Sequence, residues 1–237
     1  RKNPFDFQLN TVIDDDTVPK TILTLEQEAR LLDFAKSDTV YHKNYDEILI
    51  LLKTGLRISE LCGMTVTDLD FENHLILVNH QLLRNTELGY YIETPKTKSS
   101  ERQVPMVEVT CQALKRVLAV QNQNECVEID GYSNFLFLNR NGYPKTACDF
   151  NSILRNLIKK YNKCHEEKLP HITPHTLRHT FCTNCANAGM NPKALQYIMG
   201  HANITMTLNY YAHATCNSAM EEMKRLEKEQ QARCLVL

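Results

Sequence analysis

The stretch that most constrains this chain is residues 172–211, ITPHTLRHTFCTNCANAGMNPKALQYIMGHANITMTLNYY. It contains two helix-start signals, Thr-Pro at 173–174 and Asn-Pro at 191–192, each with a capping side chain before a proline suited to the first helical position. A glycine follows each predicted helix as a stop signal. The stretch therefore predicts two short helices, followed by a third short helical run that carries Tyr210 and Tyr211.

Chemistry-bearing side chains gather in this stretch. His175 and Arg178 lie three residues apart, so they share a helix face close to the positive N-terminal end. His201 falls on the turn directly after the second stop. Cations and imidazoles at a helix N-terminus form an anion site, above all for phosphate, and a tyrosine beside such a site is a candidate nucleophile.

Length and composition set the limits of the fold. With 237 residues and 43% hydrophobic residues, the chain is long enough for one large domain, or one domain with a tail. We find no apolar run near 18 residues and no secretion signal, so we expect no membrane association. The nine cysteines are scattered, and the pair in Cys182-Thr-Asn-Cys185 is interpreted as structural rather than zinc-binding or redox-active.

The net charge of the chain says little, but the distribution of its charged residues along the sequence is informative. A net charge of −1, from 27 basic and 28 acidic residues, argues mildly against a nucleic-acid binder. However, basic residues collect in the segments 96–102 and 155–163, which is compatible with a basic face on a balanced protein.

The order of elements predicts an α+β, mostly helical fold. Residues 1–23 are polar, contain two prolines and are interpreted as an interdomain linker. Because the chain begins without Met at such a segment, we expect a fragment whose upstream domain has been removed. Helices are predicted at 24–36, 45–54, 59–64, 110–123 and 147–164, and the stretches 74–83, 89–96 and 101–106 predict a small three-stranded antiparallel sheet.

Residues 214–237 form a separate C-terminal segment. Its apolar positions are typical of an amphipathic helix, whose apolar face packs either on its own domain or on a neighbouring protomer. Both arrangements are open at this point.

Two further basic positions stand out. Arg57 follows Gly55 in the helix junction TGLRISEL, with Glu60 as a structural residue that orients it. Lys96 and Lys98 lie in the second hairpin, PKTKSSER. Taken alone, such residues are usually surface or capping side chains.

Together these segments resemble the tyrosine recombinases, or phage-type integrases, and among them most closely the integrases of conjugative transposons. The resemblance covers residues 25–213 and is specific because five elements occur in a fixed order. These are Arg57 in GLRISEL, Lys96 in a Lys-Thr context, HTLRH at 175–179, MGH at 199–201, and Tyr211 followed by Ala-His.

The resemblance implies a catalytic domain at 24–213 that recombines DNA through a 3′-phosphotyrosyl intermediate, without metal or ATP. Arginines can clamp the phosphate oxygens bidentately, a lysine can protonate the leaving 5′ oxygen, and the tyrosine attacks. We expect double-stranded DNA as the partner, a homotetramer on paired DNA sites, an excisionase as accessory protein, no cofactor, and action in the bacterial cytoplasm. The implied catalytic residues are Arg57, Lys96, His175, Arg178, His201 and Tyr211.

Several alternatives stay open. Tyr210 also fits the nucleophile by distance, Lys98 competes with Lys96, and His179 is interpreted as a packing residue. A type IB topoisomerase-like nicking and rejoining enzyme would use the same chemistry. A metal hydrolase would instead use the histidines at 175, 179, 201 and 213 as ligands, and a non-catalytic DNA-binding relative ranks lowest.

Overall fold

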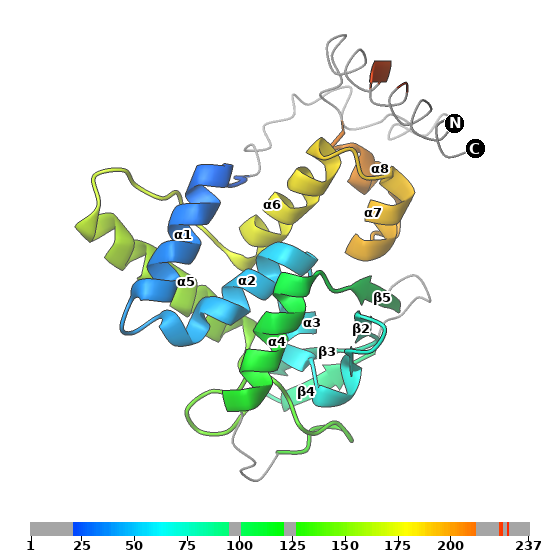
Figure 1. Cartoon of the computed structure of the whole chain (residues 1–237). Coiled ribbons are helices and arrows are strands. Elements are labelled where there is room, and N and C mark those ends of the chain that lie inside the picture. Colours follow the sequence, from blue (N-terminus) through cyan, green and yellow to red (C-terminus); the bar gives the residue numbers. More distant parts are fainter. Residues whose placement is uncertain (1–20, 95–100, 121–126, 212–222, 225–226, 228–237) are drawn as a thin grey trace, which may run out of the picture.

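The computed structural model describes residues 21–94, 101–120, 127–211, 223–224 and 227. Helices form most of it, and short antiparallel strands lie to one side (Figure 1). The α+β, mostly helical class is therefore confirmed. The helices are α1 (Leu25–Ser37), α2 (Tyr45–Thr54), α3 (Ile58–Gly63), α4 (Glu108–Val120), α5 (Ala147–Cys164), α6 (Pro174–Asn187), α7 (Pro192–Met199) and α8 (Ile204–Leu208), with the 3-10 turns η2 (His42–Asn44) and η3 (Val66–Asp68).

The helix ends follow the local signals in the sequence. Thr24 caps α1 in a reciprocal capping box with Gln27, and Thr173 caps α6 through the backbone N–H of Thr176. Gly55 and Gly200 end α2 and α7 in the left-handed conformation, with φ of 65° and 60°. These ends are the points from which the candidate site is built.

Helix α2 lies at the centre of the hydrophobic core. Its five consecutive apolar residues 48–52 are all buried, so this middle part of the helix is surrounded by the core on every side. It contacts α1, α4 and α6. A second, smaller cluster lies between α6 and α7 and includes Cys182, Leu195 and Met199, with Tyr210 and Tyr211 packed against it. The cysteine pair is free of disulfides, and Cys182 is buried as an apolar side chain.

The strands form two sheets rather than one. Strand β2 (Leu75–Val78) pairs with β1 (Leu69–Asp70) and β5 (Arg102–Pro105), whereas β3 (Gln81–Asn85) pairs only with β4 (Gly89–Glu93). A three-stranded antiparallel sheet is therefore present, but its predicted membership was wrong. The stretch expected as one strand over 74–83 divides between the two sheets.

A buried histidine accounts for the division. His80 lies at the break, is only 4% exposed, and donates from Nε2 to the carbonyl oxygen of Gly63 at 2.7 Å. Gly63 packs directly on β3, because a Cβ there would stand 2.8 Å from the backbone nitrogen of Leu82. The chain thus leaves the first sheet to dock on the end of α3.

Helix α8 ends earlier than the sequence suggested. It stops at Leu208, so Tyr210 and Tyr211 lie in the turn after the helix and not within it. Lys96, Lys98 and nearly all of the predicted C-terminal helix fall outside the described residues. Among the residues that the structure does describe, no helix is long and apolar enough to cross a membrane.

Candidate active site

Arg57 is fixed where α2 gives way to α3. The turn requires glycine at position 55, since a Cβ there would come within 2.4 Å of the Phe181 ring. The backbone N–H and Nη1 of Arg57 each donate to Glu60, at 2.7 Å, and Nη2 donates to the carbonyl oxygen of Gly200 at 2.8 Å. Its side chain stays 35% exposed, so the guanidinium is held from behind and faces the surface.

Arg178 reaches the same place from the first turns of α6. Nη1 donates to the carbonyl oxygen of Gly55 and Nη2 to that of Met199, and the residue is buried. Burial and then the positive charge of Arg57 lower the pKa of Arg178 to about 10. It therefore remains a cation at neutral pH. The two arginines donate to the neighbouring carbonyls of Met199 and Gly200, which brings their guanidiniums close to each other.

His201 lies beside this pair in an uncharged form. It follows the left-handed Gly200, and its Nδ1 contacts the hydroxyl of Thr207 at 3.0 Å. Burial, followed by the charges of Arg178 and Arg57, lowers its pKa to about 4. A neutral imidazole carries a hydrogen on one ring nitrogen. It can therefore donate one hydrogen bond to an oxyanion without being protonated itself.

A buried ion pair behind Arg57 was not predicted. Arg102, at the start of β5, donates from Nη1 and Nη2 to the two carboxylate oxygens of Glu60, at 2.9 and 2.8 Å. Burial would raise the pKa of Glu60, but the hydrogen bonds and charge of Arg102, and then Arg57, lower it to about 2. The sequence offered one signal that Arg102 is buried. Alternate residues of a strand face the same side, and Arg102 is two residues before the buried Val104 on its strand.

The two histidines of α6 differ in exposure, since His175 is exposed and His179 is half-buried. Their ring centroids lie 6.5 Å apart. Nδ1 of His179 is hydrogen-bonded to the hydroxyl of Tyr210. Burial, with a smaller contribution from Cys182, raises the pKa of Tyr210 to about 12. His179 thus pairs with the tyrosine that was the second candidate for the nucleophile.

Tyr211 is not brought to the arginines. Its hydroxyl donates to the carbonyl oxygen of Met190 at 2.6 Å, in the connection between α6 and α7. Burial raises the pKa of this phenol as well. The structure therefore assembles Arg57, Arg178 and His201 around one point, while the Tyr211 hydroxyl contacts Met190. His175 is exposed on α6, three residues before Arg178.

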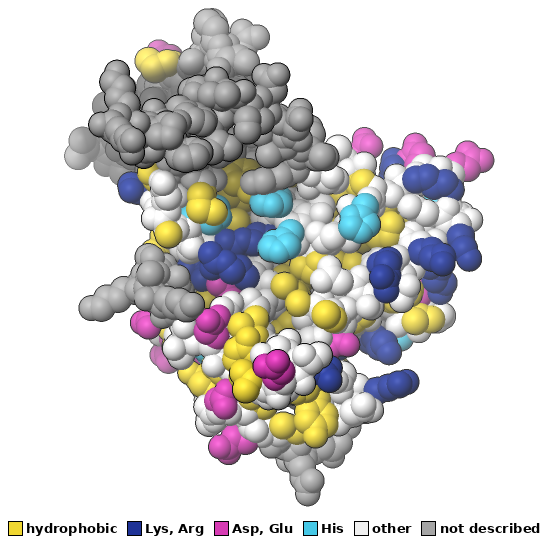
Figure 2. All heavy atoms as spheres, turned by 180° about the vertical axis from the view of Figure 1, so that it is seen from behind, with side chains coloured by type: hydrophobic (Ala, Val, Ile, Leu, Met, Phe, Trp, Pro, Cys, Tyr) yellow, Lys and Arg dark blue, Asp and Glu magenta, His cyan; other side chains and the backbone are white. Residues whose placement is uncertain are grey.

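The surface agrees with an anion site. On one face of the molecule, Lys and Arg side chains form a patch directly beside histidine side chains (Figure 2). Two fixed cations and a neutral histidine suit the non-bridging oxygens of a phosphate. In the part of the chain that is described, no group of three or more His, Cys, Asp or Glu residues could hold a metal ion.

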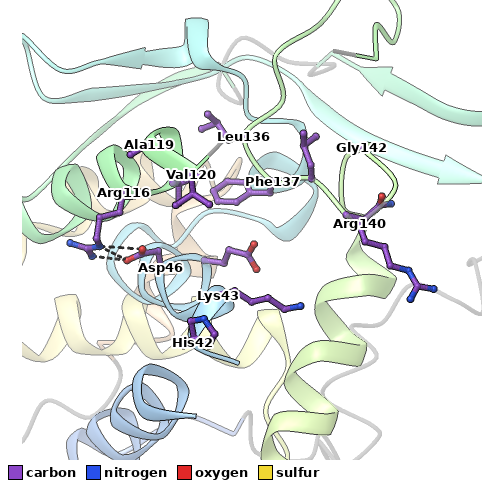
Figure 3. Close-up of a pocket in the computed structure, with 14 residues that line it drawn as sticks. His42, Lys43, Asp46, Arg116, Ala119, Val120, Leu136, Phe137, Arg140 and Gly142 are labelled. Atoms are coloured by element: carbon purple, nitrogen blue, oxygen red, sulfur yellow. Dashed lines mark hydrogen bonds and ion pairs between the residues drawn. The ribbon is translucent and has the colours of Figure 1, made fainter. Parts of the chain in front are cut away.

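A pocket of about 660 Å³ is lined by other residues than this site (Figure 3). It is formed by η2, α2, α4 and the loop 136–142, and Arg116 forms an ion pair with Asp46 at its edge. Its described lining residues include none of Arg57, Arg178 and His201. The arginine and histidine site is therefore distinct from this pocket, and Arg57 is its most exposed member, whereas Arg178 and His201 are buried.

Comparison with known families identifies the fold. The model of the phage integrase family matches residues 21–218. The chain belongs to the phage integrase family. Relatives at 74% identity over 236 residues include the transposases from transposon Tn916 of Enterococcus faecalis and from transposon Tn1545 of Streptococcus pneumoniae. The alignment takes in 100% of this chain but 58% of either relative, so the chain spans under three-fifths of their length.

Solved structures give the same picture. The Tn1549 transposon integrase in complex with circular intermediate DNA superposes with a TM-score of 0.86 at 64% identity, covering 95% of this chain and 73% of that one. XerA recombinase superposes with a TM-score of 0.61 at 26% identity, covering 88% and 66%. The predicted likeness to tyrosine recombinases, and among them to transposon integrases, is confirmed.

Proposed function

We propose that this chain is the catalytic part of a site-specific recombinase of a mobile element, which cuts and rejoins double-stranded DNA through a 3′-phosphotyrosyl intermediate. The observation that carries the proposal is the pairing of Arg57 and Arg178 on adjacent carbonyls beside neutral His201. Membership of the family and the DNA complexes of the Tn1549 integrase support it.

The arrangement supports a clamp for the charge that grows in the transition state. Arg57 and Arg178 hold the non-bridging oxygens of the scissile phosphate, and His201 donates a hydrogen bond to one of them. Because these donors are fixed by backbone carbonyls before DNA arrives, little reorganisation accompanies the reaction. Transfer of the phosphate to a phenol replaces one phosphoester bond with another, so the bond energy is kept and rejoining needs no ATP.

The proton transfers use the remaining residues. The phenol oxygen bonds to phosphorus and gives its proton to His175, while the bond to the 5′ oxygen breaks and Lys96 protonates that oxygen. Rejoining runs the same steps in reverse. His175 is suited to the role because it is exposed on the first turn of α6, three residues before Arg178 on the same helix.

Tyr211 is the proposed nucleophile, ahead of Tyr210. Two Tn1549 integrase structures on DNA carry single substitutions, arginine to lysine in one and tyrosine to phenylalanine in the other, at positions 154 residues apart. Arg57 and Tyr211 are also 154 residues apart in this chain. Because the Tyr211 hydroxyl rests on Met190, attack requires that the turn after α8 rearranges when DNA binds.

The wider organisation belongs to the same proposal. Residues 1–23 act as a linker, 24–213 as the catalytic domain, and 214–237 as a tail that packs in cis or is exchanged between protomers. The working form is a homotetramer on two DNA sites in the bacterial cytoplasm, with an excisionase as accessory protein.

A nicked suicide duplex, from which the cleaved end diffuses away, tests the proposal. Wild-type protein should accumulate a covalent protein–DNA adduct in the presence of EDTA, and Tyr211→Phe should form none. Tyr210→Phe, which removes the contact with His179, is the matched control and should still form the adduct. An adduct in Tyr211→Phe but not in Tyr210→Phe would reverse the assignment, and no adduct with any variant would refute the proposed chemistry.

A further inference from the structure

One end of helix α7 receives three arginines. The consecutive carbonyl oxygens of Ile198, Met199 and Gly200 accept hydrogen bonds from Arg102, Arg178 and Arg57 respectively. The last carbonyls of a helix have no intrahelical donor and carry the negative end of the helix dipole. This helix end therefore acts as a fixed frame, on which guanidiniums from three separate segments are aligned.

Arg102 differs from the other two because it is buried from solvent. Its side chain is 0% exposed, and its Nε donates to Ile198 at 2.7 Å. Gly200 lies against it, since a Cβ at that position would be 3.0 Å from Nη1 of Arg102. A side chain in this position does not reach a DNA phosphate, so any effect on the reaction passes through its neighbours.

The neighbour that transmits such an effect is Glu60. Oε1 of Glu60 accepts from the Nη1 atoms of both Arg57 and Arg102, and Oε2 accepts from Arg57 N–H and Arg102 Nη2. All four contacts are between 2.7 and 2.9 Å. The carboxylate is thus held at both oxygens by Arg102 and at Oε2 by the backbone N–H of Arg57, and in that orientation it presents Oε1 to the guanidinium of Arg57.

Building on the recombinase activity proposed above, we infer that Arg102 is a positioning residue for DNA strand cleavage. Through Glu60 and the end of α7, it holds Arg57 where that guanidinium meets the scissile phosphate. Without the fork of Arg102, Glu60 keeps one fixed donor, the backbone N–H of Arg57, so its Oε1 is held less firmly against the Arg57 guanidinium. A misplacement on the order of 1 Å of a group that holds the reacting phosphate costs about 100-fold in rate.

A second tie between β5 and α7 provides a matched control. The backbone N–H of Gln103 donates to the hydroxyl of Tyr197 at 3.0 Å. This bond joins the same strand to the same helix as Arg102 does, but within the described part of the chain the hydroxyl forms no hydrogen bond with Glu60 or Arg57. If docking of β5 on α7 were all that mattered, loss of either tie would have a similar effect on cleavage.

The test measures adduct formation by the full chain on the suicide duplex at saturating DNA. Arg102→Met, which keeps the apolar stem and removes the fork, should cleave about 100-fold more slowly. Arg102→Lys should recover part of the rate, because it keeps the charge but not the paired geometry. Tyr197→Phe should cleave within about twofold of wild type, as expected for loss of an exposed hydroxyl remote from the clamp. Thermal unfolding is recorded for each variant.

A double-mutant cycle separates positioning from general support of the fold. If Arg102 acts through Arg57, then Arg102→Met should slow Arg57→Ala by less than about threefold, although it slows wild type about 100-fold. Equal slowing in both backgrounds, or a wild-type rate in Arg102→Met, would overturn the inference. Should Arg102→Met not fold, Arg102→Lys takes its place in the same cycle. An inactive wild type would instead refute the proposed function.

Discussion

Replacing Glu60 by glutamine removes the negative charge that Arg57 and Arg102 share, with almost no change in shape. The carboxylate is 7% exposed, and its pKa falls from the usual 4.5 to about 2 in the folded protein. A difference of that size corresponds to about 3 kcal/mol of stability at neutral pH. Loss of one partner of a buried ion pair costs a similar amount, about 3–5 kcal/mol.

The pH dependence gives the prediction its sharpest form. Because the folded pKa is the lower one, the ionised carboxylate stabilises the fold fully above pH 4.5, and this contribution is lost as the pH falls towards 2. The stability gap between wild type and Glu60→Gln should therefore be about 3 kcal/mol at pH 7 and shrink steadily below pH 4.5.

Urea unfolding at a series of pH values measures this gap directly. At pH 7, a loss of about 3 kcal/mol also predicts a melting temperature lower by about 6–12 °C for a chain of this size. The control is Glu26→Gln, whose carboxylate is 81% exposed in an ion pair with Arg30. It should cost less than about 0.5 kcal/mol. If wild type and Glu60→Gln were equally stable at pH 7, or if the difference in their stability did not change with pH, the reasoning would be refuted.

Three further outcomes follow from the same site. His201 should titrate near pH 4 by NMR of its ring protons, and a midpoint above pH 6 would show that burial and the two arginines do not act on it as described. Gly200→Ala should lower stability by about 1–2 kcal/mol in urea unfolding, because alanine at this left-handed position is strained, and should also slow adduct formation because the new Cβ presses on Arg102. Unchanged stability would contradict this. Arg178→Lys should slow adduct formation about 100-fold or more, since an ammonium cannot hold two carbonyls in a planar fork. A rate within fivefold of wild type would count against a bidentate clamp.

The parts of the fold that the sequence predicted well are those governed by local rules. The capping box at Thr24, the prolines that begin α6 and α7, and the left-handed glycines at 55 and 200 all act within a few residues. These rules located the helix ends on which Arg57, Arg178 and His201 depend. That Arg57 and Arg178 act together was implied only by the resemblance to the tyrosine recombinases, and the fold brings both side chains to the end of α7.

What the sequence did not predict depends on distant contacts. The strand break at His80 needs the Gly63 carbonyl, 17 residues earlier, to accept its hydrogen bond. The burial of Arg102 needs Glu60 and Ile198, which lie 42 and 96 residues away. No local pattern distinguishes such an arginine from an exposed one at the end of a strand. The orientation of Tyr211 towards Met190 likewise arises from the packing of α6 on α7.

The convergence of three guanidiniums on the last turn of α7 also affects how the protein matures. Arg57 and Gly200 are separated by 143 residues, and Arg102 and Ile198 by 96, so the clamp closes only after nearly the whole described chain has docked. A molecule still folding, or one that has opened locally at this helix, lacks aligned arginines. Under the recombinase activity proposed above, such a molecule lacks the clamp that strand cleavage requires, so the proposed ability to break DNA arises only with completion of the tertiary structure.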